Sequence, residues 1–113
     1  MILIVKDILG SNTALSTDAG GVLFTEIHKA LSGKQDIKLD FRDVEVMSSA
    51  FLNVAIGQLY HAFGPDELNE HLKIVNLPVE DRALLKKVID RAKEYFSDQK
   101  AFDQRMNDLY GDN

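Results

Sequence analysis

Residues 37–59, IKLDFRDVEVMSSAFLNVAIGQL, contain the pattern that decides the fold. At its start, Ile37, Leu39 and Phe41 alternate with polar residues, which is the period of two expected of a half-buried strand. From Ser49 onward the apolar residues follow helical spacing and take up most of the helix surface. The stretch therefore predicts a strand that leads through a short loop into a largely buried helix.

Ser48 and Ser49 stand at the start of this predicted helix. The first N–H groups of a helix lack intrahelical partners, and a serine side chain that accepts one of these hydrogen bonds contributes about 1 kcal/mol. The same end of a helix favours negative charge, so the fold is expected to tolerate a phosphate on Ser49, whose charge would act on any partner covering it. Two interpretations stay open: the serines only cap the helix, or one of them also switches binding.

The segment before this stretch predicts a strand, a loop and a helix. The apolar run at residues 1–6 is typical of a strand, and residues 11–21 are rich in turn and capping residues. A short second strand is expected within residues 13–16. A helix is predicted from about Asp18, with Thr17 or Asp18 as its N-cap.

The segment after the central helix predicts one more strand and two helices. Gly64 and Pro65 end the central helix, residues 71–77 form a strand, and residues 80–96 form an amphipathic helix. Residues 98–113 are predicted to add a C-terminal helical extension, which packs on the domain or provides the contact of a homodimer. Its apolar stripe at helical spacing, preceded by a candidate cap at Ser97, consists of Phe102, Met106 and Leu109.

Strands that alternate with helices in this way predict a single α/β domain over residues 1–113, in the order β-α-β-α-β-α plus the C-terminal helix. Its small sheet is expected to be parallel, with right-handed crossovers. Ligands and partners of such folds meet the rim where strands end and helices begin. The predicted partner or ligand rim consists of Asp40, Asp18, Gly20, Gly21, Phe51 and Asn53.

The composition narrows the class of function. A chain of 113 residues with 45% hydrophobic and 27% charged residues fits one globular domain, and the lack of cysteine excludes disulfides and thiolate metal sites. A net charge of −5 argues against a general nucleic-acid binder, because phosphate contacts require clustered cations. The first apolar run is too short to be a signal sequence or to cross a bilayer. We therefore expect a cytoplasmic protein whose partner is another protein.

No catalytic or metal-binding motif is apparent. His28, His61 and His71 lack the spacing of metal ligands, and neither Ser48 nor Ser49 lies in a G-x-S-x-G sequence. We accordingly expect no enzymatic activity, no cofactor and no bound metal.

Residues 39–59, LDFRDVEVMSSAFLNVAIGQL, resemble the central motif of STAS domains, the family of bacterial anti-sigma factor antagonists. In that family a strand of the type hydrophobic-Asp-Phe/Leu leads through a short loop to a serine-headed helix. The loop reads roughly Asp-Ser-Ser/Thr-Gly-Leu, and a partner kinase phosphorylates its first hydroxyl residue. An ungapped alignment puts Ser49 at that position, Ser48 at the preceding aspartate and Phe51 at the glycine. The similarity is closer to STAS-like proteins of unassigned function.

The resemblance implies a non-enzymatic regulatory module that binds a protein partner when unmodified and releases it when phosphorylated. The implied partner is a serine kinase of the histidine-kinase-like ATPase type or an anti-sigma factor. Asp40 is expected to hydrogen-bond the loop around Ser48 and Ser49, or else to help hold a metal with a nucleotide, as the resemblance allows. The alternative function is the binding of a nucleotide or small phosphorylated ligand between Asp40 and a loop at Gly20 and Gly21, where glycines would let backbone N–H groups approach an anion.

Overall fold

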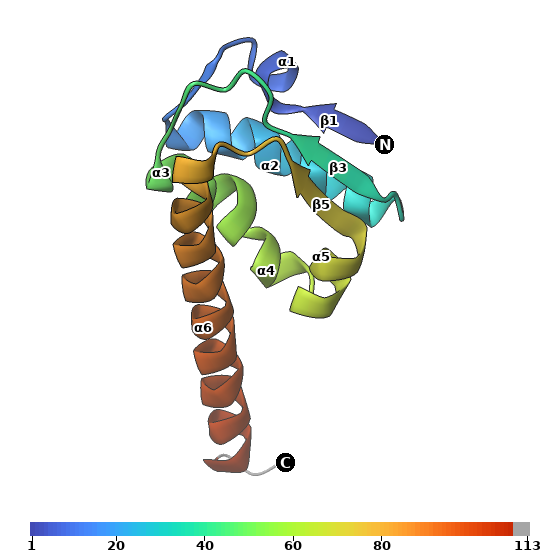
Figure 1. The fold of residues 1–113 in the computed structure, drawn as a ribbon. Helices are drawn as coiled ribbons and strands as arrows, with labels where there is room; N and C mark the ends of the chain where they lie inside the picture. The colour runs from blue at the N-terminus through green and yellow to red at the C-terminus, as the bar shows by residue number, and fades with distance from the viewer. Residues whose placement is uncertain (110–113) are drawn as a thin grey trace.

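A parallel three-stranded sheet forms the centre of the fold. The structure is a computed structural model that describes the backbone of residues 1–109 and the side chains of residues 1–95. Strands β1 (Ile2–Ile4), β3 (Ile37–Asp40) and β5 (Leu72–Val75) lie in the order β1-β3-β5 and are all parallel (Figure 1). The predicted α/β class and the parallel strands are therefore confirmed.

A second, two-stranded parallel ladder joins β2 (Thr13–Ala14) to β4 (Val46–Met47). The predicted short strand near residues 13–16 is thus confirmed. The ladder brings the segment before α2 against the segment before the two serines, although more than thirty residues separate them in sequence. This contact creates the site described below.

Helix α2 (Thr17–Ser32) packs on β3 and on the central helix through an apolar face that includes the fully buried Leu23 and Ile27. Its N-cap is Ser16, so the predicted cap at Thr17 or Asp18 is wrong. The extended backbone of Ser16 lets its hydroxyl oxygen accept a hydrogen bond from the N–H of Ala19 at 3.0 Å.

The predicted central helix is three consecutive segments. Helix α3 (Ser49–Leu52) runs into a π-helical turn, η1 (Asn53–Gly57), which is followed by α4 (Leu59–Ala62). The prediction that this region is interior is confirmed, because its apolar side chains are 0 to 1% exposed at Phe51, Leu52, Ala55, Ile56 and Leu59.

Two short helices were not predicted. Residues 1–6 are not all strand: β1 ends at Ile4, and α1 (Val5–Leu9) follows, because Val5 turns inward and is fully buried. Gly10 ends α1 in the left-handed conformation, at φ 66°. Helix α5 (Pro65–His71) begins with proline at its first turn, where the missing N–H costs nothing.

Helix α6 (Val79–Leu109) is one continuous helix in the structure, so the predicted break and cap at Ser97 are wrong. Its first turns pack on η1 and α3, with Leu85 and Val88 buried, and its remainder extends away from the sheet (Figure 1). No helix in the part of the chain described here combines the length and apolar character needed to cross a membrane. The apolar stripe from Phe102 to Leu109 lies outside the residues with described side chains, so its docking and the homodimer stay predictions.

Candidate functional site

Ser48 is the N-cap of α3, and its hydroxyl both donates and accepts a hydrogen bond inside the protein. The hydroxyl oxygen accepts a hydrogen bond from the N–H of Phe51 at 3.1 Å, and the hydroxyl donates to the carbonyl oxygen of Leu15 at 2.7 Å. The side chain is half-buried between these groups. Ser48 therefore ties the head of α3 to the end of β2, and modification of its hydroxyl would remove the hydrogen that makes this link.

Ser49, the first residue of α3, is exposed, and its hydroxyl makes no hydrogen bond to the described residues. Beside it, β2 and β4 present one face to solvent. Because Thr13 pairs with Val46 in a parallel ladder, Leu15 and Ser48 share that solvent face with them. Leu15 and Val46 are each 48% exposed, so two apolar side chains lie in water on the ladder that leads into α3, where Ser49 follows Ser48.

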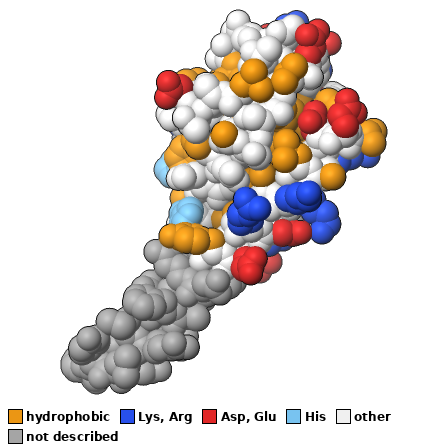
Figure 2. All heavy atoms as spheres, turned by 90° about the vertical axis from the view of Figure 1, so that its left-hand side faces the viewer, with side chains coloured by type: hydrophobic (Ala, Val, Ile, Leu, Met, Phe, Trp, Pro, Cys, Tyr) orange, Lys and Arg blue, Asp and Glu red, His pale blue; other side chains and the backbone are white. Residues whose placement is uncertain are grey.

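Figure 2 views the molecule from the side on which α3 and α6 lie in Figure 1, and it shows apolar side chains exposed between groups of charged ones. We call the surface formed by Leu15, Val46, Ser49 and Ala50 the α3 head. All four residues are exposed.

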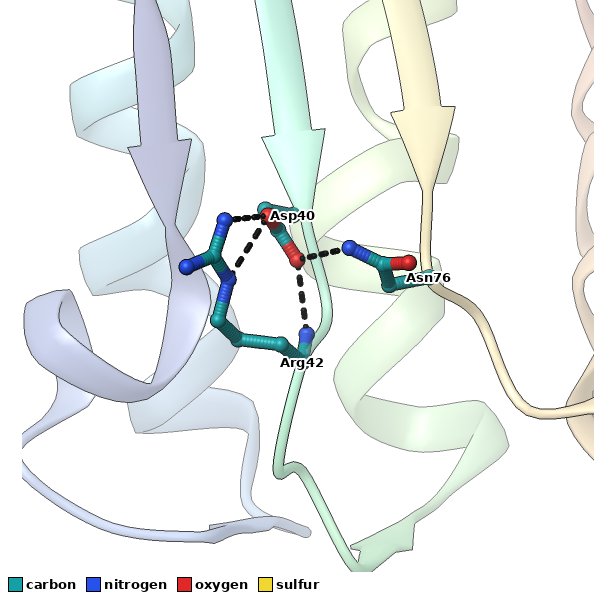
Figure 3. A network of polar contacts seen from close by, with 3 residues as sticks. All are labelled: Asp40, Arg42 and Asn76. Carbon is teal, nitrogen blue, oxygen red and sulfur yellow. Dashed lines mark hydrogen bonds and ion pairs between the residues drawn. The ribbon is translucent and has the colours of Figure 1, made fainter.

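Asp40 lies at the end of β3, where its carboxylate is 2% exposed. One carboxylate oxygen accepts hydrogen bonds from the backbone N–H of Arg42 at 2.9 Å and from the side-chain amide of Asn76 at 3.0 Å (Figure 3). The other oxygen accepts from Nε of Arg42 at 2.8 Å and from Nη2 of the same guanidinium. The carboxylate is thus saturated by groups from β3 and from the end of β5.

The electrostatics of Asp40 follow from these partners. Hydrogen bonds from the Arg42 side chain, and then from Asn76, lower the pKa of Asp40 from 3.8 to about 2, although burial alone would raise it. The same pairing raises the pKa of Arg42. Asp40 therefore stays ionised at all physiological pH values.

The family model that matches the chain describes a STAS-like domain of unknown function and covers residues 19–82, from the first turn of α2 to the beginning of α6. The chain belongs to this family. No curated protein and no solved structure matches the chain. The family predicted from residues 39–59 is thereby confirmed.

In this STAS-like domain Asp40 does not reach the two serines. Its hydrogen bonds go to Arg42 and Asn76, so the expectation that it binds the loop around Ser48 and Ser49 is wrong. The loop N–H that the carboxylate does satisfy is that of Arg42, two residues after Asp40.

Gly20 and Gly21 lie inside α2, so they do not form the phosphate-accommodating loop considered from the sequence. The N–H of Gly20 donates to the carbonyl oxygen of Ser16 at 3.1 Å. A Cβ on Gly20 would lie 2.8 Å from the carbonyl oxygen of Phe51 and 2.9 Å from Cβ of Val54, whereas one on Gly21 would meet nothing within 4 Å. Gly20 is therefore required by the close approach of α2 to the central helix.

The other predicted rim residues are divided between surface and core. Asp18 is exposed in the first turn of α2, whose packing on α3 places it on the same side as the serines. Phe51 is fully buried, so it cannot contact a partner. Asn53 is exposed and lines a hollow of about 320 Å³ between η1 and α6, together with His61 and Tyr95.

Sequence reasoning missed the partners of Asp40 and the apolar flanks of Ser49. Asn76 lies 36 residues from Asp40 in sequence, and its only local signal is an asparagine directly after a strand. The sequence placed Leu15 only within the predicted binding loop at residues 11–21, and the prediction that Val46 extends the apolar side of the strand is wrong, because Val46 is 48% exposed. Among residues with described side chains, no three His, Asp or Glu groups are placed to hold a metal ion.

Proposed function

We propose that this STAS-like domain is a non-enzymatic regulatory module that binds a protein partner through the α3 head, and that phosphorylation of Ser49 releases the partner. The partner is a serine kinase of the histidine-kinase-like ATPase type or an anti-sigma factor, as the family resemblance implies. The observation that supports the proposal is the exposed hydroxyl of Ser49, which makes no hydrogen bond to the described residues and directly follows Ser48, the serine bonded to Leu15.

The different surroundings of the two serines favour Ser49 as the phosphoacceptor. Phosphorylation of Ser48 would remove the hydrogen that it donates to Leu15 and force a bulky dianion into a half-buried gap. Phosphorylation of Ser49 breaks no hydrogen bond among the described residues. A kinase can therefore modify Ser49 without unfolding the head of α3.

The apolar flanks explain why a phosphate would release the partner. A partner that covers Leu15 and Val46 must exclude water from the neighbouring hydroxyl as well. A phosphate adds about −1.5 to −2 charges at that point, and burying this charge without a cation costs more than the apolar contact gains. No lysine or arginine is hydrogen-bonded or ion-paired at the α3 head in the described residues to compensate for it.

The test compares Ser49→Asp with Ser32→Asp. Both substitutions place a carboxylate at an exposed serine. Ser32, however, is the last residue of α2, at the other end of that helix from Gly20, where α2 contacts α3. We expect wild type and Ser32→Asp to retain the same partner in pull-downs from the source cells, and Ser49→Asp to lose it. A phosphopeptide carrying Ser49 in protein purified from those cells would support the kinase step. Equal retention of the partner by all three proteins would reject the switch.

The alternative function, binding of a nucleotide or small phosphorylated ligand, needs Asp40 and the two glycines around one phosphate. The geometry gives these residues other roles, since Asp40 is saturated and Gly20 is packed against Phe51. Calorimetry with ATP and GTP separates the two functions. Tight binding by the domain alone would favour the alternative over the interaction module.

A further inference from the structure

The three-stranded sheet has one covered face and one open face. On the covered face Ile37 and Leu39 are 1% and 0% exposed beneath the helices. On the opposite face the register aligns Ile2, Lys38 and Lys73 in one row across the three strands. All three are exposed, and Ile2 is 59% exposed. We call this surface the open face.

A second row lies beside the first. Ile4, Asp40 and Val75 are in register on the same face, and the side chain of Arg42 lies over Asp40 (Figure 3). Parallel sheets are found almost only with both faces covered, because the helices that connect their strands lie on both faces. Here one face of a parallel sheet leaves isoleucine and valine side chains partly in water.

The two lysines indicate what kind of surface would cover this face. Lys38 and Lys73 are direct neighbours on adjacent strands, and like charges in such positions repel one another. Neither forms an ion pair with any described residue; Lys73 donates only to the carbonyl oxygen of Asn69, at 3.1 Å. In a chain of net charge −5 this is a local reversal of sign. An acidic group from outside would relieve the repulsion.

A hollow of about 330 Å³ opens beside the lysines and offers room for a side chain. Its lining includes Ile2 and both lysines as well as Asp36 and Glu70. Asp36 is hydrogen-bonded to His71 at 2.6 Å, and Glu70 lies 3.8 Å from the same ring. The two acids thus have a partner in His71, whereas the two lysines have no acidic partner among the described residues.

We propose that the open face docks an amphipathic acidic helix of a protein partner. Its apolar stripe would cover Ile2, Ile4 and Val75, as helices cover parallel sheets in α/β folds, and its carboxylates would meet Lys38 and Lys73. A second copy of this chain fits less well, because two-fold packing of this face would set one lysine pair against the other. Nucleic acid is disfavoured because, among the described residues, the face offers only the two lysines and Arg42, whose guanidinium is already paired with Asp40, whereas phosphate binding needs more clustered cations.

The test uses the full chain and a helical peptide of about five turns, with leucines along one stripe and glutamates on both flanks. We expect saturable binding by fluorescence anisotropy, with amide NMR shifts at residues 2–4, 38–40 and 73–75. Reversal of both lysines (Lys38→Glu with Lys73→Glu) should weaken binding roughly tenfold, since each exposed pair contributes a few tenths to 1 kcal/mol. Lys29→Glu with Lys87→Glu changes the net charge equally at exposed sites elsewhere and should have no effect.

Three outcomes would overturn the proposal. The first is equal binding of a peptide with glutamine in place of glutamate. The second is tighter binding of a duplex oligonucleotide or of anionic vesicles than of the acidic peptide. The third is a dimer in sedimentation that the lysine reversals dissociate, which would make a second copy the occupant. Thermal unfolding shows whether the reversed variant is folded, and the single Lys73→Glu variant replaces it if it is not. Ser49→Asp should leave peptide affinity unchanged, because the open face and the α3 head are separate surfaces.

Discussion

Two polar clusters lie near the ends of strands in this domain, and they differ in how completely their groups are satisfied. The Asp40 cluster is closed, since the carboxylate is buried and each oxygen accepts two hydrogen bonds. The pair of serines at the start of α3 is only partly satisfied, because Ser48 is hydrogen-bonded on both sides whereas Ser49 has no partner among the described residues. A polar residue at the rim of this α/β fold stabilises the fold when its hydrogen bonds are internal, and it is available to partners only when its polar atoms have no internal partner.

The largest effect is expected from Asp40→Ala. The change leaves the N–H of Arg42 and the amide of Asn76 without their acceptor, and we expect the free energy of unfolding to fall by about 3 kcal/mol. Urea denaturation measures it. Asp36→Ala, at the other end of the same strand, is the control and should cost under about 0.5 kcal/mol, because Asp36 is exposed. Equal losses of unfolding free energy in the two variants would mean that the hydrogen bonds of the Asp40 cluster do not stabilise the fold more than an exposed carboxylate does.

Acid should destabilise the Asp40 cluster, because it protonates the Asp40 carboxylate. The pKa of Asp40 is lower in the folded state, about 2, than its ordinary value of 3.8. Its contribution to stability is therefore complete above pH 3.8 and is lost as the pH falls through about 2. We expect the difference in stability between wild type and Asp40→Asn to shrink over that interval in acid denaturation. A difference that stays constant down to pH 2 would contradict the lowered pKa.

The base of the α3 head can be tested at Gly20. Gly20→Ala puts a methyl group 2.8 Å from the backbone oxygen of Phe51, which cannot rotate away, so we expect a loss of about 2 kcal/mol. Gly21→Ala meets nothing within 4 Å and gains helix propensity, so it should stabilise by about 0.5 kcal/mol. Thermal unfolding of the two variants distinguishes the effect of the close helix contact from the effect of replacing a flexible glycine. Similar shifts for both variants would argue against a close helix contact.

A smaller difference in stability is expected between the alanine variants of the two serines. Ser48→Ala removes the N-cap and the bond to Leu15, and we expect a loss of about 1 kcal/mol. Ser49→Ala removes a hydroxyl without a partner among the described residues and should change stability by less than about 0.5 kcal/mol. Guanidinium denaturation measures both. A larger loss for Ser49→Ala would show that its hydroxyl is not free.

The smallest effect is expected at His71, outside both clusters. The hydrogen bond to Asp36 raises the pKa of this exposed histidine above its ordinary 6.5. A raised folded pKa means that the stabilisation is complete below pH 6.5 and is lost as the pH rises through the folded value. His71→Gln should therefore lower the melting temperature slightly at about pH 5 and not at about pH 9. An equal loss at both pH values would indicate packing instead of charge.

Much of the fold could be predicted from the spacing of apolar residues along the sequence. The alternation of Ile37, Leu39 and Phe41 identified β3, and the apolar run after Ser49 identified the interior helix, because burial imposes these periods directly. The π-helical turn at Asn53–Gly57 could not be read, since a helix that is apolar on nearly all sides shows no change of phase. Helix α5 was missed because it buries only Leu68, although its proline and two acids in the first turn were a usable signal.

The site was harder to predict than the fold. The sequence identified the serine pair, but it could not tell Ser48 from Ser49, because that distinction depends on Leu15, brought close only by the pairing of β2 with β4. It also grouped Asp40 with the serines, since both follow strands. Their separation depends on Asn76, whose amide is placed by β5 and by a left-handed backbone at φ 58°.

The close contact at Gly20 determines how rigid this end of the domain is when a partner protein binds it. Where α2 meets the central helix, Gly20 lies so close to the backbone oxygen of Phe51 and to Cβ of Val54 that rotation of a side chain can move neither atom aside. The start of α2 and the top of α3 must then shift together or not at all. A protein that binds this end therefore contacts a rigid surface. The free and bound forms of the domain should superimpose closely, and little of the binding free energy is spent on ordering this surface.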